Sequence, residues 1–171
     1  HDQVEAMAMG DRVLVLNKGV VHQIGTPKQV YDDPADTFVA TFLGSPPMNL
    51  LENGDVIVGF RPEHLVPAQQ APSAAIRLTL KIQNLEYLGA EWIVYGQAVN
   101  GVGKPVAGGG EQVDGEGKAE TAQPGKTIIA RVPSADLKIG ETYDFGVVEA
   151  HLRFFDKATE KRAPARALSW P

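Results

Sequence analysis

Two adjacent prolines separate two stretches of this sequence that have different hydrophobic patterns. Helical spacing ends at Gly44, and Ser45-Pro46-Pro47 cannot extend a helix, because proline lacks a backbone N–H and clashes with the preceding turn. Before this break, helical and extended patterns alternate. After it, short stretches have the period of two that is typical of strands. We therefore expect two domains, residues 1–44 and residues 45–171.

The first stretch predicts short helices around a β-hairpin. We expect helices at residues 2–10, 27–33 and 37–44 and strands at residues 12–17 and 20–25. The first strand is a continuous apolar run, which is typical of a strand buried on both faces. Gly19 suits a tight turn, while Thr26 and Asp36 are residue types that cap helix N-termini. Many apolar side chains here need cover, so we expect this part to pack on the rest of the chain or on a second copy.

The second stretch predicts β structure. We expect strands at residues 50–52, 56–60, 76–88, 91–98, 126–132, 142–148 and 152–155. Several short strands at this spacing predict a small barrel or sandwich. Residues 100–125 are rich in Gly, Glu and Lys, which predicts a long hairpin tip or a flexible loop.

Composition excludes several classes of function. The formal net charge of −5 opposes binding to a phosphate backbone, so nucleic acid is not an expected partner. The absence of cysteine excludes disulfides and thiolate chemistry. No apolar run approaches the ~20 residues that span a bilayer, and the first residues do not resemble a signal peptide. The sequence enters a helical pattern at His1 without an initiator Met, which suggests an excised piece of a longer chain.

Five segments resemble one protein family, in the order that the family uses. HDQVEAM at residues 1–7 resembles the switch-histidine segment of ABC ATPases, and residues 11–49 resemble the end of that domain in carbohydrate importers. GFRPEHL at 59–65 and NLEYLGAEWIVY at 84–95 resemble the transport-associated OB (TOBE) domain that follows it. The tail, from ARVPSADLKIGETYDFGV to LRFFDKATEKR, is similar to the last strands of that domain.

The resemblance implies the ATP-binding subunit of an importer of the maltose, glycerol-phosphate or trehalose kind. Its fold would be mainly β, with an OB-like (TOBE) barrel or sandwich at residues 45–171 after a small α/β remnant of the ATPase domain at 1–44. His1 would be the switch histidine, which contacts the γ-phosphate and the attacking water only in the intact subunit. That subunit would bind ATP and Mg²⁺.

The phosphate loop and the signature helix of the family do not occur in these 171 residues. We therefore expect the parent subunit to be an enzyme, and this stretch alone to bind no cofactor and to hydrolyse no ATP. The resemblance implies three partners: a second copy, the permease subunits and a cytoplasmic regulatory protein. It also implies a peripheral position on the cytoplasmic face of the cell membrane.

Arg61, Glu63 and His64 are the candidate ligand-binding residues, because a guanidinium, a carboxylate and an imidazole together suit an anion or a sugar. The alternative, which we favour, is a turn in which Arg61 and Glu63 pair with neighbouring groups. His1 and Asp2 lack the further ligands that a metal site needs, so we expect no metal.

Three aromatic residues, Tyr87, Trp92 and Tyr95, could stack on a sugar ring. By alternation, however, Trp92 and Tyr95 lie on opposite faces of one strand, so core packing is expected for at least one of them.

Two functions follow from this reading. The first is a regulatory and dimerisation module of an importer ATPase subunit. The alternative is a free-standing OB-type module that binds a small ligand or effector.

Overall fold

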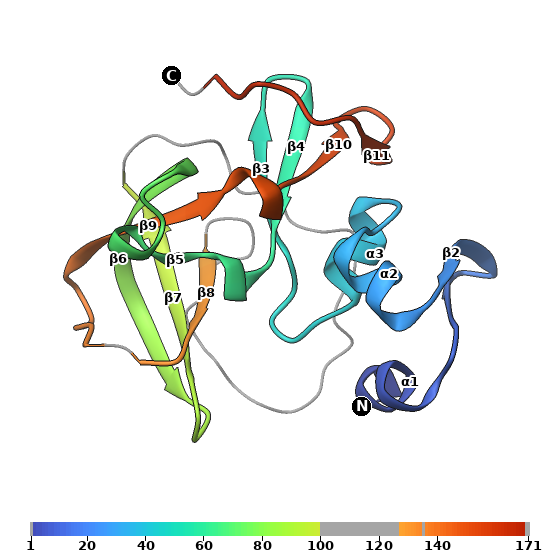
Figure 1. Ribbon diagram of the computed structural model, residues 1–171, viewed down its shortest axis with the longest axis horizontal. Coiled ribbons are helices and arrows are strands. Elements are labelled where there is room, and N and C mark those ends of the chain that lie inside the picture. Colours follow the sequence, from blue (N-terminus) through green and yellow to red (C-terminus); the bar gives the residue numbers. More distant parts are fainter. Residues whose placement is uncertain (1, 100–126, 135, 170–171) are drawn as a thin grey trace.

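The computed structural model describes residues 2–99, 127–134 and 136–169. Figure 1 shows an N-terminal part, residues 2–43, lying to one side of a larger β part, residues 48–169. The predicted loop at residues 100–125 and the candidate His1 lie outside the described residues. Among the described helices, none has the length and apolar character needed to cross a membrane.

The N-terminal part contains three helices and a hairpin, as the sequence predicts. They are α1 (Asp2–Met9), β1 (Val13–Asn17), β2 (Val20–Gly25), α2 (Pro27–Asp32) and α3 (Thr37–Phe42). The Thr26 hydroxyl accepts a hydrogen bond from the Gln29 N–H, and Gln29 Oε1 accepts one from the Thr26 N–H. This capping box starts α2. Asp36 accepts the Val39 N–H at 2.9 Å and starts α3.

The β part is built from two antiparallel sheets. The first has the order β11-β10-β4-β3, with β3 (Asn49–Asn53), β4 (Val56–Phe60), β10 (Arg153–Asp156) and β11 (Arg162–Ala163). The second has the order β5-β9-β6-β7-β8, with β5 (Val66–Pro67), β6 (Ala74–Tyr87), β7 (Trp92–Ala98), β8 (Ile128–Val132) and β9 (Thr142–Val148). Three 3-10 turns connect strands: η1 (Pro62–His64), η2 (Ala68–Gln70) and η3 (Glu149–His151).

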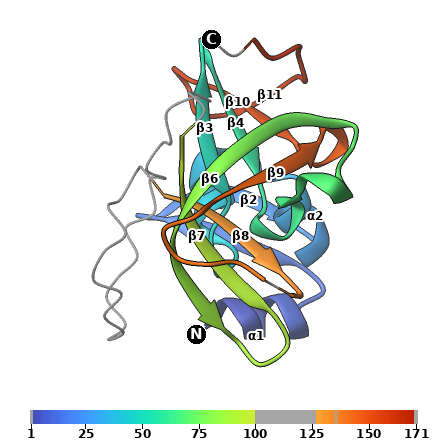
Figure 2. The ribbon, with the colours of Figure 1, turned by 90° about the vertical axis from the view of Figure 1, so that its left-hand side faces the viewer.

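Strand β6 shows why the second sheet curls around a core. Its side chains alternate, so that Leu78 and Leu80 are buried while Arg77 and Lys81 are exposed. The pairing with β7 is irregular between Ile82 and Asn84, and such an irregularity bends and twists a strand. Figure 2 shows β6 as a long arched strand.

Both sheets contribute to one hydrophobic core, which includes Val58 and Phe60 of β4, Leu78 of β6 and Phe145 of β9. The prediction of a mainly β fold with an OB-like domain is therefore confirmed.

The prediction that the first strand is buried on both faces is wrong for the described chain. Val13 and Val15 of β1 are 8% and 2% exposed, but Leu14 and Leu16 are 49% and 50% exposed. The described residues supply apolar partners for one face of the hairpin only, in a cluster with Val30 of α2. A continuous apolar run therefore forms a one-sided strand here.

The N-terminal part packs on the β part, which is one of the two ways in which its apolar residues were expected to find cover. Ala40 of α3 lies in a buried cluster with Met48, Leu50, Ile57 and Phe155. These four residues come from β3, β4, β10 and the segment before β3. The N-terminal part and the β part therefore share a buried hydrophobic cluster.

Candidate functional site

Arg61 lies between β4 and η1, where it joins the two parts of the chain. Its side chain is buried, with 2% of the residue exposed. Nη1 donates to the carbonyl oxygens of Ala40 at 2.9 Å and Leu43 at 2.6 Å, and Nη2 donates to that of Tyr31 at 2.7 Å. The last carbonyls of a helix lack partners within the helix and carry partial negative charge. One guanidinium therefore caps the C-terminal ends of both α2 and α3.

Tyr31 connects this guanidinium to Glu63. The Arg61 guanidinium carbon lies 3.8 Å from the centroid of the Tyr31 ring, and the Tyr31 hydroxyl donates to Glu63 Oε1 at 2.8 Å. Burial, reinforced by the hydrogen bond to Glu63, raises the pKa of Tyr31 to about 12. Burial also lowers the pKa of Arg61. The structure thus places two of the three candidate ligand residues in contacts with the N-terminal part.

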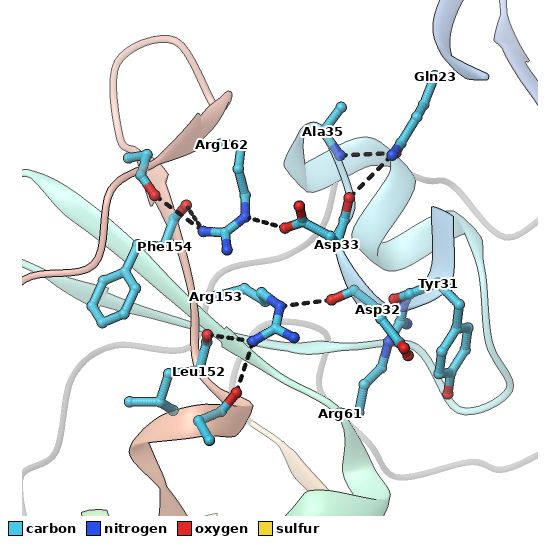
Figure 3. Close-up of polar contacts among 12 residues, drawn as sticks. Gln23, Tyr31, Asp32, Asp33, Ala35, Arg61, Leu152, Arg153, Phe154 and Arg162 are labelled. Carbon is cyan, nitrogen blue, oxygen red and sulfur yellow. Dashed lines mark hydrogen bonds and ion pairs between the residues drawn. The ribbon is translucent and has the colours of Figure 1, made fainter. Parts of the chain in front are cut away.

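Two further arginines of the β part reach the end of α2, as Figure 3 shows. Arg153 of β10 donates from Nε to the Asp32 carbonyl oxygen at 2.6 Å. Arg162 of β11 donates from Nε to Asp33 Oδ1 at 2.7 Å. Its backbone N–H donates to the Ala35 carbonyl oxygen at 2.8 Å. We call this contact between the α2 and α3 C-terminal ends and Arg61, Arg153 and Arg162 the junction.

The hairpin also contacts the segment between α2 and α3. Gln23 of β2 donates to the Asp33 carbonyl oxygen at 3.0 Å and accepts the Ala35 N–H at 2.9 Å (Figure 3). Because Asp33 also pairs with Arg162, the hairpin and the last strand of the β part hold the same short segment. The junction therefore extends from the hairpin through the loop to the β part.

His64, the third candidate, stacks on another histidine. Its ring lies 3.8 Å from that of His151, centroid to centroid, at an interplanar angle of 9°. Burial, and then the neighbouring His151, lower the pKa of His64. Its Nδ1 atom is buried and has no hydrogen-bond partner among the described residues. His64 therefore lies next to the junction without bonding to the N-terminal part.

The three aromatic candidates do not form one platform. The rings of Tyr87 and Trp92 contact each other, with centroids 4.9 Å apart, and Trp92 packs against the β core. Tyr95 instead donates to Glu86 Oε2 at 3.1 Å. Over the described ranges, no cluster of three or more His, Asp or Glu residues could hold a metal ion.

Sequence reasoning did not single out Tyr31, Arg153 or Arg162 as site residues. Tyr31 precedes Arg61 by 30 residues, and Arg162 follows Asp33 by 129. No local period relates residues at such distances. The available signal was the resemblance itself, because GFRPEHL and LRFFDKATEKR contain all three junction arginines.

Comparison with curated proteins identifies the class. The chain is homologous, over part of their length, to the ATP-binding subunits of carbohydrate-type ABC importers, as its five segments predict. No protein family model matches it.

The relatives carry the name sn-glycerol-3-phosphate import ATP-binding protein UgpC. The chain is 36% identical to that of Rhodopseudomonas palustris strain BisA53 over 178 residues, which cover 95% of the chain and 46% of the relative. It is 32% identical to that of Psychromonas ingrahamii over 184 residues, or 94% of the chain and 44% of the relative. The chain thus spans less than half the length of these relatives.

Proposed function

We propose that this chain is the regulatory and dimerisation end of the ATP-binding subunit of an ABC importer. Residues 1–44 would complete its ATPase domain, and residues 45–171 would form its TOBE domain. The observation that carries the regulatory role is the junction, in which Arg61 of the β part binds the C-terminal ends of α2 and α3. Homology over 94–95% of the chain supports the class.

The relatives' name makes sn-glycerol-3-phosphate, or a related sugar or polyol, the proposed substrate of the importer. The intact subunit would bind ATP with Mg²⁺ and place His1 against the γ-phosphate. It would pair with a second copy and with permease subunits on the cytoplasmic face of the membrane. A cytoplasmic regulatory protein would act on the β part.

The junction is suited to regulation because it is both packed and hydrogen-bonded. A shift of α2 or α3 would break charge-assisted bonds to Arg61, each contributing about 1.5–3 kcal/mol. It would also disturb the buried cluster around Ala40. The β part therefore follows the helices as a rigid body, or the junction breaks. The first response carries a movement of the ATPase domain to the β part.

Two experiments test this proposal. Light scattering after size exclusion should show the 171-residue chain in a concentration-dependent monomer–dimer equilibrium at micromolar concentrations. If the chain is strictly monomeric up to about 100 µM, any dimer is very weak, and this result would contradict the dimerisation role. In the complete subunit assembled with its permease, Arg61→Lys should change substrate-stimulated ATP hydrolysis more than the control Arg166→Lys does. Equal rates in the two variants would remove the regulatory role.

A ligand role for Arg61, Glu63 and His64 stays a prediction. Arg61 Nη1 and Nη2 and Glu63 Oε1 are already bonded to Tyr31, Ala40 and Leu43, whereas the buried Arg61 Nε has no hydrogen-bond partner among the described residues. Calorimetric titration of the chain with glycerol phosphate, sugars and oxyanions tests the role directly. Binding that His64→Phe abolishes would support a ligand site at this turn.

A further inference from the structure

Two histidines from distant parts of the sequence stack face to face beside the junction. His64 ends η1 and His151 ends η3, and their nearly parallel rings lie 3.8 Å apart. His64 is half-buried, whereas His151 is exposed. Neutral imidazoles stack well at this distance, but two imidazolium rings would place like charges in contact.

The charged groups around the pair come from five elements, one of which is β8, the strand packed on η1, whose Arg131 interacts with Glu63. Asp32 of α2 and Glu63 of η1 are acidic and favour a protonated His64, while Arg153 of β10 and His151 of η3 oppose it. Glu149 begins the same turn as His151. Glu63 is already engaged by the Tyr31 hydroxyl, which leaves it less able to neutralise a second positive charge. Burial acts in the same direction as the positive neighbours and is the largest cause of the lowered pKa of His64.

Each histidine is also close in sequence to an arginine of the junction. Arg61 directly precedes the 3-10 turn η1, and His64 is its last residue. The His64 N–H donates to the Arg61 carbonyl oxygen at 3.0 Å. On the other side, Arg153 follows His151 by two residues, and its Nη1 donates to the Ala150 carbonyl oxygen at 3.0 Å. A displacement of either turn would therefore also move Arg61 or Arg153.

We propose that the His64–His151 stack is a pH-sensitive latch. When neutral, it holds the turns η1 and η3 together, and with them Arg61 and Arg153 of the junction; when both rings are protonated, it loosens these turns and with them the junction. The direction follows from linkage. Because the pKa of His64 is lowered in the folded chain, its contribution to stability is fully present above the ordinary histidine pKa of about 6.5. That contribution is lost as the pH falls below this value.

Hydrogen exchange measured by NMR on the 171-residue chain tests the latch. Two amides cross the junction: the Thr37 N–H donates to the Glu160 carbonyl oxygen at 3.0 Å, and the Arg162 N–H donates to that of Ala35 at 2.8 Å. After correction for intrinsic rates, their opening constants should rise at least about threefold between pH 7.5 and 5.5. Amides between β6 and β9 serve as the reference and should change less.

Three variants assign the effect. His151→Gln removes one exposed ring, so it should flatten the pH response of both junction amides and raise the titration midpoint of His64. His64→Phe with His151→Phe keeps two stacked rings that cannot be protonated and should flatten the response in the same way. His22→Gln removes the histidine that pairs with Asp36, the residue before the reporter Thr37, so it shows whether His22 causes the pH response; the latch predicts the same response as in the original chain.

Three results would overturn the proposal. The first is a flat response in the original chain, and the second is an undiminished response in His151→Gln. The third requires no variant to fold: His64 in the original chain titrates with the midpoint of a free histidine.

Discussion

Replacing Arg61 with lysine keeps the positive charge at the junction but removes the planar group that reaches three carbonyl oxygens. A lysine ammonium is a single point of charge, so it cannot bond the carbonyl oxygens of Tyr31 on α2, Ala40 on α3 and Leu43 at the C-cap of α3 together. It also loses the stacked position over the Tyr31 ring.

The magnitude follows from these contacts. One lost charge-assisted hydrogen bond costs about 1.5–3 kcal/mol, and the lost cation–π contact adds about 0.5–1 kcal/mol. We expect Arg61→Lys to lower the free energy of unfolding by about 2–4 kcal/mol. For a chain of 171 residues, this corresponds to a fall in Tm of roughly 5–15 °C.

Urea denaturation followed by circular dichroism measures this loss, and a thermal scan gives the change in Tm. The matched control is Arg166→Lys, because Arg166 makes an exposed ion pair with Asp55, in which the two side chains are 46% and 81% exposed. Such pairs contribute about 0–1 kcal/mol. If Arg61→Lys costs no more than Arg166→Lys, the argument that Arg61 caps two helices fails.

Three other predictions use different parts of the structure. Gly59→Ala should cost about 1–3 kcal/mol in urea denaturation, because a Cβ there would lie 2.6 Å from Met48 Sδ; an unchanged midpoint would contradict this packing. Asp36→Ala should cost about 1 kcal/mol by removing the N-cap of α3, and a Tm equal to that of the original chain would exclude the cap. Absorbance at 295 nm should show two tyrosines, Tyr31 and Tyr95, that ionise only at about pH 12, and Tyr31→Phe should remove one of them. Because these pKa values are raised by folding, stability should fall as the pH rises from about 10 to 12, and a constant free energy of unfolding over that range would contradict the assignment.

Local signals in the sequence were enough to predict most elements. Thr26 and Asp36 were expected to start helices, and both accept the backbone N–H bonds that this role requires. The period of two predicted a strand at residues 76–88, which corresponds to β6, and Gly19, at φ 81°, makes the predicted hairpin turn. These features depend on neighbours within a few residues, which is why the sequence alone reveals them.

The remaining features depend on partners that are distant in the sequence. The residues from Arg12 to Asn17 do not reveal that one face of this strand is exposed, because the burial of a face depends on which other residues pack against it. The alternative that we favoured for Arg61, pairing with neighbouring groups, could not specify that the neighbours are carbonyl oxygens 18 to 30 residues earlier. The stack of His64 on His151 required two turns from opposite ends of the β part to meet.

The position of β10 and β11 has a consequence for synthesis of the chain. These late strands complete the sheet that β3 and β4 begin, and Arg162 closes a contact with Asp33 across 129 residues. The ribosome synthesises α2 and α3 well before Arg153 and Arg162, so the helices emerge without these two partners. Among the contacts of the described residues, those available to the two helices before Arg153 and Arg162 are made are the caps, the hairpin and the earlier contacts to Arg61 and the Ala40 cluster. Such long-range closure is slow, so the helices should gain their full protection only in the last step of folding.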